Sequence, residues 1–254
     1  EFNAINSATS VAVNMNNVTA LAASNLSDVN TLALSINAGQ FSNGAGLTTV
    51  AISDATIDAT ALATAIDNLD GINGGSSTDM TLASEATINV DAGEVTHMLL
   101  DETENRLDIV DQNIVVTGNI SVDDANLLSE TTTGTVTASI ATTESIAELK
   151  TLTDTSNAYT IVISSSDATA TAGDLLAIDG KTTVRIDASE ITAISGSFNQ
   201  ITELYGSEGV NGLGNETITS TEDLTVAAAS VFDSLTEGTV TAATISSDTD
   251  ALAY

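Results

Sequence analysis

Residues 120–139 read ISVDDANLLSETTTGTVTAS, and residues 224–243, LTVAAASVFDSLTEGTVTAA, align with them without a gap. The two segments share the block Gly-Thr-Val-Thr-Ala, at 134–138 and at 238–242. Internal similarity of this kind is typical of repeat proteins, in which each unit packs mainly on its neighbours. We therefore expect the chain to be built from repeats.

Two weaker similarities extend the pattern. Residues 88–99, INVDAGEVTHML, resemble residues 184–195, VRIDASEITAIS, and residues 168–187 form a weaker third copy of the long segment. The copies are separated by near multiples of about 24–26 residues, a plausible length for one coil of a solenoid. The spacing therefore predicts coils of that length.

The pattern inside a unit favours short strands. β-Branched residues alternate with polar ones, as in Ile88 and Val90, and polar corners follow them. We predict a mainly β fold, a parallel β-solenoid with short helical segments at 60–69, 144–152 and 198–205, where apolar residues recur every three or four positions. The alternative is a pair of tandem β-sandwiches, which the scarcity of aromatic residues disfavours.

No linker or change of composition divides the chain. Pro is absent, and the 17 Gly residues are scattered along the sequence. We expect a single elongated repeat domain over residues 1–254, with weaker repeat character in 1–85. The sequence begins Glu1-Phe2, which suggests a piece of a longer protein.

The charge balance excludes several classes of function. The chain has 4 Lys and Arg residues against 35 Asp and Glu residues, a net charge of −31. So few cations cannot neutralise a nucleic-acid backbone or hold a polybasic contact with a membrane. With no Cys there is no disulfide, thiolate chemistry or Cys-ligated zinc. No apolar run is long enough for membrane insertion.

The composition also bears on folding and location. High net charge with few aromatic residues is typical of disorder, but the apolar fraction of 42% and the mean hydropathy of +0.21 favour a folded chain. Extreme acidity, many Ser and Thr residues and scarce Lys favour a protein outside the cell. We expect an extracellular or cell-surface location.

A family resemblance follows from four short blocks, which lie within residues 120–254. They are Thr132-Thr133-Gly134-Thr135-Val136, Ile178-Asp179-Gly180, Asp187-Ala188-Ser189 and Gly212-Leu213-Gly214-Asn215-Glu216. This part of the chain resembles the repeat arrays of very large cyanobacterial and other bacterial secreted or cell-surface proteins. The resemblance implies an extracellular array and says nothing about an active site.

Few residues suggest catalysis. His97 is the one histidine, and its sequence context predicts the polar face of a strand rather than a catalytic partner. Lys181 and Arg185, near Asp179 and Asp187, leave open a carbohydrate-binding or lyase activity of a β-solenoid. Positions four apart on a strand share a face, however, and two cations there can simply pair with carboxylates. We expect no enzymatic activity.

Calcium is the cofactor that the acidity favours. Divalent cations can offset the repulsion among 35 carboxylates, and extracellular modules bind calcium with dissociation constants of about 10⁻⁴–10⁻³ M. The best candidate ligands are Asp67, Asp70 and Asn73, oxygen donors around Gly71. The stretch departs from the EF-hand pattern at Leu69, and a turn that ends a helix also explains it.

The predicted function is a non-catalytic structural or adhesive segment that self-assembles into a layer or filament with calcium. A solenoid needs a cover at each end, so the expected partners are neighbouring repeats or identical subunits, together with surface polysaccharide. Ice binding is a further alternative, because Thr-x-Thr triplets can form a flat array. The triplets occur sporadically, at 135–137, 217–219 and 239–241.

Overall fold

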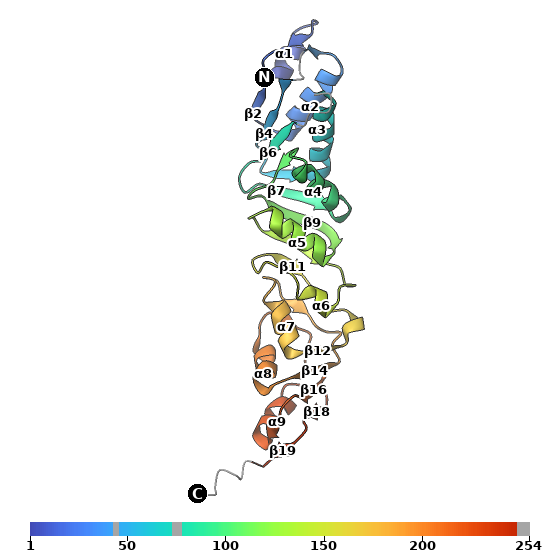
Figure 1. The fold of residues 1–254 in the computed structure, drawn as a ribbon, viewed down its shortest axis with the longest axis vertical. Helices are drawn as coiled ribbons and strands as arrows, with labels where there is room; N and C mark the ends of the chain where they lie inside the picture. Colours follow the sequence, from blue (N-terminus) through green and yellow to red (C-terminus); the bar gives the residue numbers. More distant parts are fainter. Residues whose placement is uncertain (43–45, 73–77, 248–254) are drawn as a thin grey trace. The chain divides into compact units, whose positions relative to one another are not determined.

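The computed structural model describes residues 1–42, 46–72 and 78–247 (Figure 1). The fold is mixed α/β, with 36% of the described residues in helices and 27% in strands. The prediction of a mainly β parallel solenoid is therefore wrong, whereas the helical segments predicted at 60–69, 144–152 and 198–205 are confirmed as helices 59–72, 146–149 and 198–206. Tandem β-sandwiches are wrong as well, since sandwich sheets are antiparallel and every strand pair with a described register is parallel.

Alanine explains why helix was underestimated. Helix was expected only in three short segments, whereas alanine, which is frequent along the chain, has the highest intrinsic helix propensity. Two Ala-rich segments form helices, α3 (Ala59–Ile72) and α9 (Val226–Asp233). A helix such as α3 buries five side chains, whereas most strands here have only two to five residues in all.

The chain divides into two compact units. Unit 1 comprises residues 1–118 and 127–137, and unit 2 comprises residues 119–126 and 138–254. The division runs through β9 (Asn113–Ile120), α5 (Val122–Thr131) and β10 (Val136–Ile140). The single elongated domain over 1–254 stays a prediction.

Unit 1 alternates short strands with helices. In Figure 1, α2 and α3 lie side by side next to β2, β4 and β6. Besides α3 and most of β9, its elements are α1 (Phe2–Ser7), β1 (Val13–Asn14), β2 (Ala20–Ser24), α2 (Leu26–Asn37), β3 (Phe41–Ser42), β4 (Thr49–Ile52), β5 (Thr56–Asp58), β6 (Asp79–Thr81), β7 (Thr87–Asp91), the 3-10 helix η2 (Ala92–Glu94), α4 (Val95–Thr103) and β8 (Leu107–Asp108).

The core of unit 1 is formed by columns of apolar side chains in register. Parallel pairing places one buried residue of each strand above the buried residue of the next. One column is Ile57, Ile88 and Ile114, and another is Val50, Met80 and Leu107. The helices cover these columns with residues such as Leu62, Ile66 and Met98.

Unit 2 has the same alternation with shorter helices. Besides α9, its elements are α6 (Ile146–Leu149), β11 (Ala158–Thr160), the 3-10 helix η3 (Ser165–Asp167), β12 (Thr169–Thr171), α7 (Ala172–Asp179), β13 (Ile186–Asp187), β14 (Ala193–Gly196), α8 (Phe198–Gly206), β15 (Val210–Asn211), β16 (Thr217–Ser220), β17 (Leu224–Thr225), β18 (Val240–Thr241) and β19 (Ile245–Ser246). The four-stranded sheet that lies wholly in unit 2 has the order β12-β14-β16-β18, with buried Ala170, Ile194 and Ile218 in one column.

Within each unit, carboxylates form hydrogen bonds with helix N-termini that lie 21 to 28 residues earlier in the sequence. Three helices begin with a backbone N–H that donates to an acid 21 to 28 residues further along the sequence. The pairs are Leu26 N with Asp54 (2.7 Å), Ile146 N with Asp167 (2.9 Å) and Phe198 N with Glu222 (2.7 Å). Negative charge at a helix N-terminus also interacts favourably with the helix dipole.

One loop arrangement occurs in both units. In unit 1 the side-chain oxygen of buried Gln112 accepts hydrogen bonds from the backbone N–H groups of Val110 and Asp111. The backbone carbonyl oxygen of Gln112 accepts a hydrogen bond from the Thr132 hydroxyl at 2.6 Å. The Thr132 oxygen in turn accepts the N–H of Gly134. We call this arrangement the loop anchor.

Unit 2 repeats the loop anchor with a different residue type. The carboxylate of buried Glu216 accepts hydrogen bonds from the backbone N–H groups of Gly214 and Asn215. The backbone carbonyl oxygen of Glu216 accepts a hydrogen bond from the Thr236 hydroxyl at 2.7 Å. The Thr236 oxygen accepts the N–H of Gly238. The shared sequence block found at 134–138 and 238–242 therefore marks the same local contacts.

Candidate functional site

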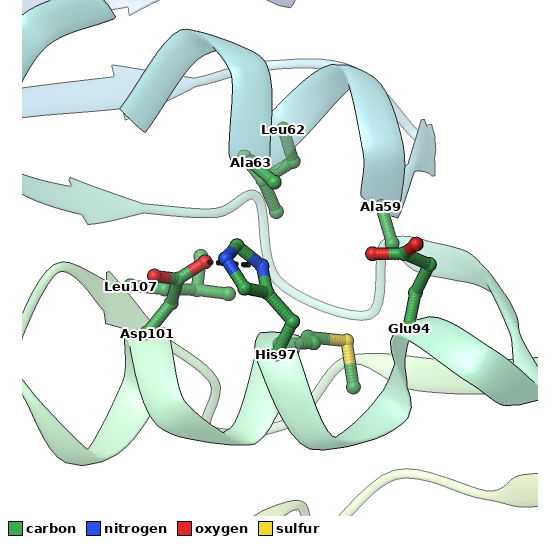
Figure 2. Close-up of a pocket in the computed structure, with 8 residues that line it drawn as sticks. Ala59, Leu62, Ala63, Glu94, His97, Asp101 and Leu107 are labelled. Atoms are coloured by element: carbon green, nitrogen blue, oxygen red, sulfur yellow. Dashed lines mark ion pairs between the residues drawn. The ribbon is translucent and has the colours of Figure 1, made fainter. Parts of the chain in front are cut away.

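The strongest concentration of charge in the described residues lies in unit 1, where α3, α4 and the start of β8 meet. The two helices enclose a small cavity, with Ala59, Leu62 and Ala63 of α3 above and His97 of α4 below (Figure 2), and Met98 also lines it. Its volume of about 10 Å³ leaves room for about one water molecule. The cavity is too small for an organic substrate.

His97 and Asp101 form a pair on one face of α4. They lie four residues apart, which places both side chains on the same side of a helix. The distance from His97 Nδ1 to Asp101 Oδ2 is 3.6 Å, and the His97 side chain is 44% exposed while that of Asp101 is 2% exposed. The pair therefore has a buried acid and a base that solvent reaches.

Arg106 joins this pair to α3. Its Nη2 atom lies 2.7 Å from Asp101 Oδ1 and 3.0 Å from Glu104 Oε2, and its Nη1 donates to Asp70 Oδ2 at 3.0 Å. We call Asp70, His97, Asp101, Glu104 and Arg106 the Arg106 cluster. The Arg106 guanidinium thus forms ion pairs with three carboxylates.

The hydrogen bonding of the cluster is incomplete. The contact between Arg106 and Asp101 Oδ1 has the distance of an ion pair without the angles of a hydrogen bond. Arg106 Nε and Asp70 Oδ1 are likewise buried without a hydrogen-bond partner among the described residues. Buried charges that are only partly hydrogen-bonded keep part of their desolvation cost.

Burial raises the pKa of the Asp101 carboxyl above its usual value. The charges of Arg106 and His97 oppose this effect, and repulsion from Asp67 and Glu104 adds to it. The pKa of Arg106 is raised in spite of burial, because Asp70, Asp101 and Glu104 favour its charged form. The cluster therefore holds a permanently charged cation beside an acid that is costly to ionise.

The predicted calcium ligands are divided between different surroundings. Asp67 is exposed on α3, Asp70 pairs with Arg106, and Asn73 lies outside the described residues. Gly71 belongs to α3, so the segment that was predicted as a ligand loop is helical up to Ile72. Within the described ranges no group of three or more His, Cys, Asp or Glu side chains could hold a metal ion. Calcium binding stays a prediction.

His97 and Arg185, which the sequence raised as candidates for catalysis, have local contacts. His97 lies on helix α4 rather than on the expected strand, because Asp91 accepts the N–H of Gly93 and starts the helical turn that α4 continues. Arg185 Nε donates to the Glu208 carbonyl at 2.5 Å. Asp179 accepts the Ser207 hydroxyl, next in sequence to the residue that Arg185 contacts.

The sequence analysis missed Arg106, Gln112 and Glu216. Arg106 is an isolated cation whose partners come from two helices, and no spacing rule connects it to them. Gln112 and Glu216 lie 20 residues before their Thr partners and differ in type. The only hint in the sequence was the conserved spacing of Thr and Gly in the two repeated blocks.

Comparison of the chain with protein-family models, with curated proteins and with solved structures finds no match. No described helix has both the length and the apolar character required to cross a membrane.

Proposed function

We propose that the chain is a non-catalytic structural or adhesive segment of an extracellular or cell-surface repeat protein, which assembles with neighbouring repeats or identical subunits in the presence of calcium. The observation that carries the proposal is the loop anchor, which both units contain. A binding or catalytic site gathers unlike residues at one place, whereas here the same contacts are built again in a second place.

The buried polar residues support this view. Six of the nine that are buried in the described part of the chain, Gln112, Thr132, Asn157, Thr182, Glu216 and Thr236, lie in loops where they bind backbone groups or one another. Burying polar groups is costly unless they are hydrogen-bonded. The hydrogen bonds of these residues therefore connect loops that lie 20 to 25 residues apart in the sequence.

Electron microscopy of the purified chain tests the proposal. We expect end-to-end fibres or sheets with calcium at a few millimolar, and fewer with sodium at matched ionic strength. Uniform monomers at every protein concentration, with and without calcium, would contradict self-assembly.

Ice binding is a second candidate, which the register of the largest sheet in unit 2 favours. Pairing aligns Thr171, Ser195, Thr219 and Thr241 in one column, and Thr169, Ala193 and Thr217 in another. Adjacent strands lie about 4.8 Å apart, so the hydroxyls are regularly spaced. Two of the triplets, 217–219 and 239–241, lie on adjacent strands, and Ala193-Ile194-Ser195 separates them from Thr169-Ala170-Thr171; the triplet at 135–137 belongs to another sheet.

Thermal hysteresis separates this candidate from the structural one. An ice binder would depress the freezing point below the melting point, and Thr219→Lys in the middle of the column would abolish the effect. Thr60→Lys, at an exposed position of α3, is the matched control. No hysteresis in the native chain would exclude ice binding.

A further inference from the structure

We propose that two copies of the chain join by strand pairing, in which the outer edge of β18 in one copy binds the outer edge of β2 in a second copy, in parallel. The proposal rests on the proposed assembly function and names the surfaces that such assembly uses. The supporting observations are an open strand edge on each surface, an incomplete column of buried side chains at each edge, and a scarcity of charge around both.

Strands β2 and β18 are the outer strands of their sheets. The orders are β2-β4-β6-β8 in unit 1 and β12-β14-β16-β18 in unit 2, and within the described ranges neither outer strand has a second neighbour. In both sheets the strands follow one another in chain order, and all their pairs are parallel. The open side of β18 is therefore where a later strand belongs, and the open side of β2 is where an earlier strand belongs, as continuation of one parallel sheet requires.

The backbone of β2 has a hydrogen-bond donor on its open side. Ala20, Thr49 and Asp79 form one row across β2, β4 and β6. Thr49 N donates to the Thr19 carbonyl at 3.3 Å and Asp79 N to the Thr48 carbonyl at 2.9 Å, so residues of this row donate to the preceding strand. The N–H of Ala20 therefore points away from β4.

Strand β18 has the matching donor. Ile218 and Val240 form a row across β16 and β18, and Ile218 N donates to the Thr239 carbonyl of the following segment at 2.9 Å. Residues of this row donate to the later strand. The N–H of Val240 therefore points away from β16, towards the side where β2 of the second copy binds.

The apolar columns of the two sheets are incomplete at the same two strands. Val50 and Ile218 are fully buried, whereas their outer neighbours Leu21 and Val240 are only partly buried. A register that places Val240 beside Leu21 joins the two columns, and the Val240 N–H then donates to the Ala20 carbonyl. Helix α1 does not fill the space beside β2, because a cavity of about 260 Å³ lies between α1, β2 and α2.

Helix α9, which packs on β18, presents an uncovered apolar surface. Residues 226–232 are apolar apart from Ser230, yet Phe232 is the one residue of α9 that is buried, and Val226 and Val231 are 55% and 39% exposed. A helix that is apolar on nearly all sides is normally buried. In the same unit α8 packs on α7, and α2, which follows β2 directly, can cover α9 of another copy in the same way.

The distribution of charge favours a second copy as the partner at these surfaces. Residues 2–53 carry one charged side chain, that of Asp28, and α9, β18 and β19 together carry one, that of Asp233. In contrast, 29 of the 35 Asp and Glu residues lie within 54–223. Copies that approach through residues 54–223 repel one another, whereas pairing of β18 with β2 brings few charges together.

Sedimentation velocity of the full-length chain with calcium at a few millimolar tests the proposal. Ala20→Pro removes the outward N–H of β2, and Val240→Pro removes that of β18. Proline is tolerated in an outer strand where its nitrogen faces solvent, so both variants should keep the fold, which far-UV circular dichroism checks. We expect each variant to associate about 10-fold more weakly than the native chain or weaker still. The matched controls Ala20→Val and Val240→Ile keep the N–H and should associate like the native chain.

A mixture of the two proline variants provides the decisive measurement. Ala20→Pro retains the β18 edge and Val240→Pro retains the β2 edge, so an equimolar mixture should form dimers that cannot grow, whereas the native contact repeats without closing. Association of either proline variant at native strength, or a mixture without dimers, would overturn the pairing of β18 with β2 and leave assembly to another surface. A native chain that stays monomeric at every concentration would overturn both this pairing and the proposed assembly.

Discussion

At the scale of single residues, Gly134 and Gly238 occupy places that admit no side chain. A Cβ atom at Gly134 would overlap the carbonyl oxygen of Gln112, and one at Gly238 would overlap that of Glu216. These carbonyl groups are the ones that accept the Thr hydroxyls of the loop anchors. Glycine is therefore required by close approach of backbone, which explains why the repeated block keeps it.

Gly134→Ala should destabilise unit 1 by about 1–3 kcal/mol, because the backbone must move to relieve the overlap. Gly206→Ala is the control, since a Cβ there meets no atom within 4 Å, and it should change the free energy of unfolding by less than about 0.5 kcal/mol. Chemical denaturation of both variants measures the difference. Equal free energies of unfolding for the two variants would show that the backbone of the loop anchor can move to accommodate a Cβ atom without loss of stability.

The ion pair between Lys150 and Asp174 makes a pH-dependent contribution. The hydrogen bond from Lys150 lowers the pKa of Asp174 below its usual value. A depressed pKa means that the stabilisation is present above the ordinary pKa near 3.9 and is lost as the pH falls below it.

Lys150→Met should therefore lower the free energy of unfolding by about 0.2–1 kcal/mol near pH 6, because the pair is partly exposed. Near pH 2 the same substitution should change the free energy of unfolding very little. Lys181→Met is the control, since Lys181 forms no ion pair within the described ranges. Denaturation curves at the two pH values measure the gap between each variant and the native chain. A gap for Lys150→Met that does not change with pH would contradict the assignment.

At the scale of elements, similar sequences do not always form the same structure. Residues 88–99 form β7, η2 and the start of α4, whereas residues 184–195 form β13, a turn and β14. Both carry apolar residues three positions apart, Val95 and Met98 in one and Ile191 and Ile194 in the other, so periodicity alone cannot decide. Pairing of Ile194 with Ala170 and Ile218 fixes a strand in the second case.

The sequence predicted helices at 60–69, 144–152 and 198–205, but similarity between segments marks equivalent structure in one pair and not in the other. The gapless pair 120–139 and 224–243 does form equivalent helices and loop anchors. In each copy a Thr hydroxyl binds the backbone carbonyl of a buried polar residue 20 residues earlier in the sequence. That side chain is Gln112 in one copy and Glu216 in the other, and no similarity connects them. The Arg106 cluster depends on three elements and could not be predicted from any one segment.

Helix α8 provides a test of the carboxylate contacts between turns. Glu222→Ala removes the acceptor of the Phe198 N–H and should destabilise unit 2 by about 0.5–2 kcal/mol, as for loss of a helix cap. Asp223→Ala, at the next position and exposed, should change the stability by less than about 0.5 kcal/mol. Urea denaturation followed by circular dichroism distinguishes the two. An equal loss in both would point to general charge effects instead.

At the scale of the whole molecule, the net charge of −31 is the dominant property. Repulsion among so many carboxylates opposes any compact state. Calcium at a few millimolar should raise the melting temperature by about 2–4 °C more than sodium at equal ionic strength, if sites bind with dissociation constants near 10⁻³ M. Scanning calorimetry measures both midpoints, and equal midpoints would show that specific sites are absent.

The carboxylate contacts between turns also bear on the order of events during synthesis. Asp54, Asp167 and Glu222 each bind the first N–H of a helix that precedes them in the chain by 21 to 28 residues. When the start of α8 emerges from the ribosome, Glu222, which completes its N-terminus, lies 24 residues further along the chain and has not yet emerged. Each of these helices therefore reaches its full set of contacts only after the following turn has emerged, which couples the maturation of the nascent chain to the progress of translation.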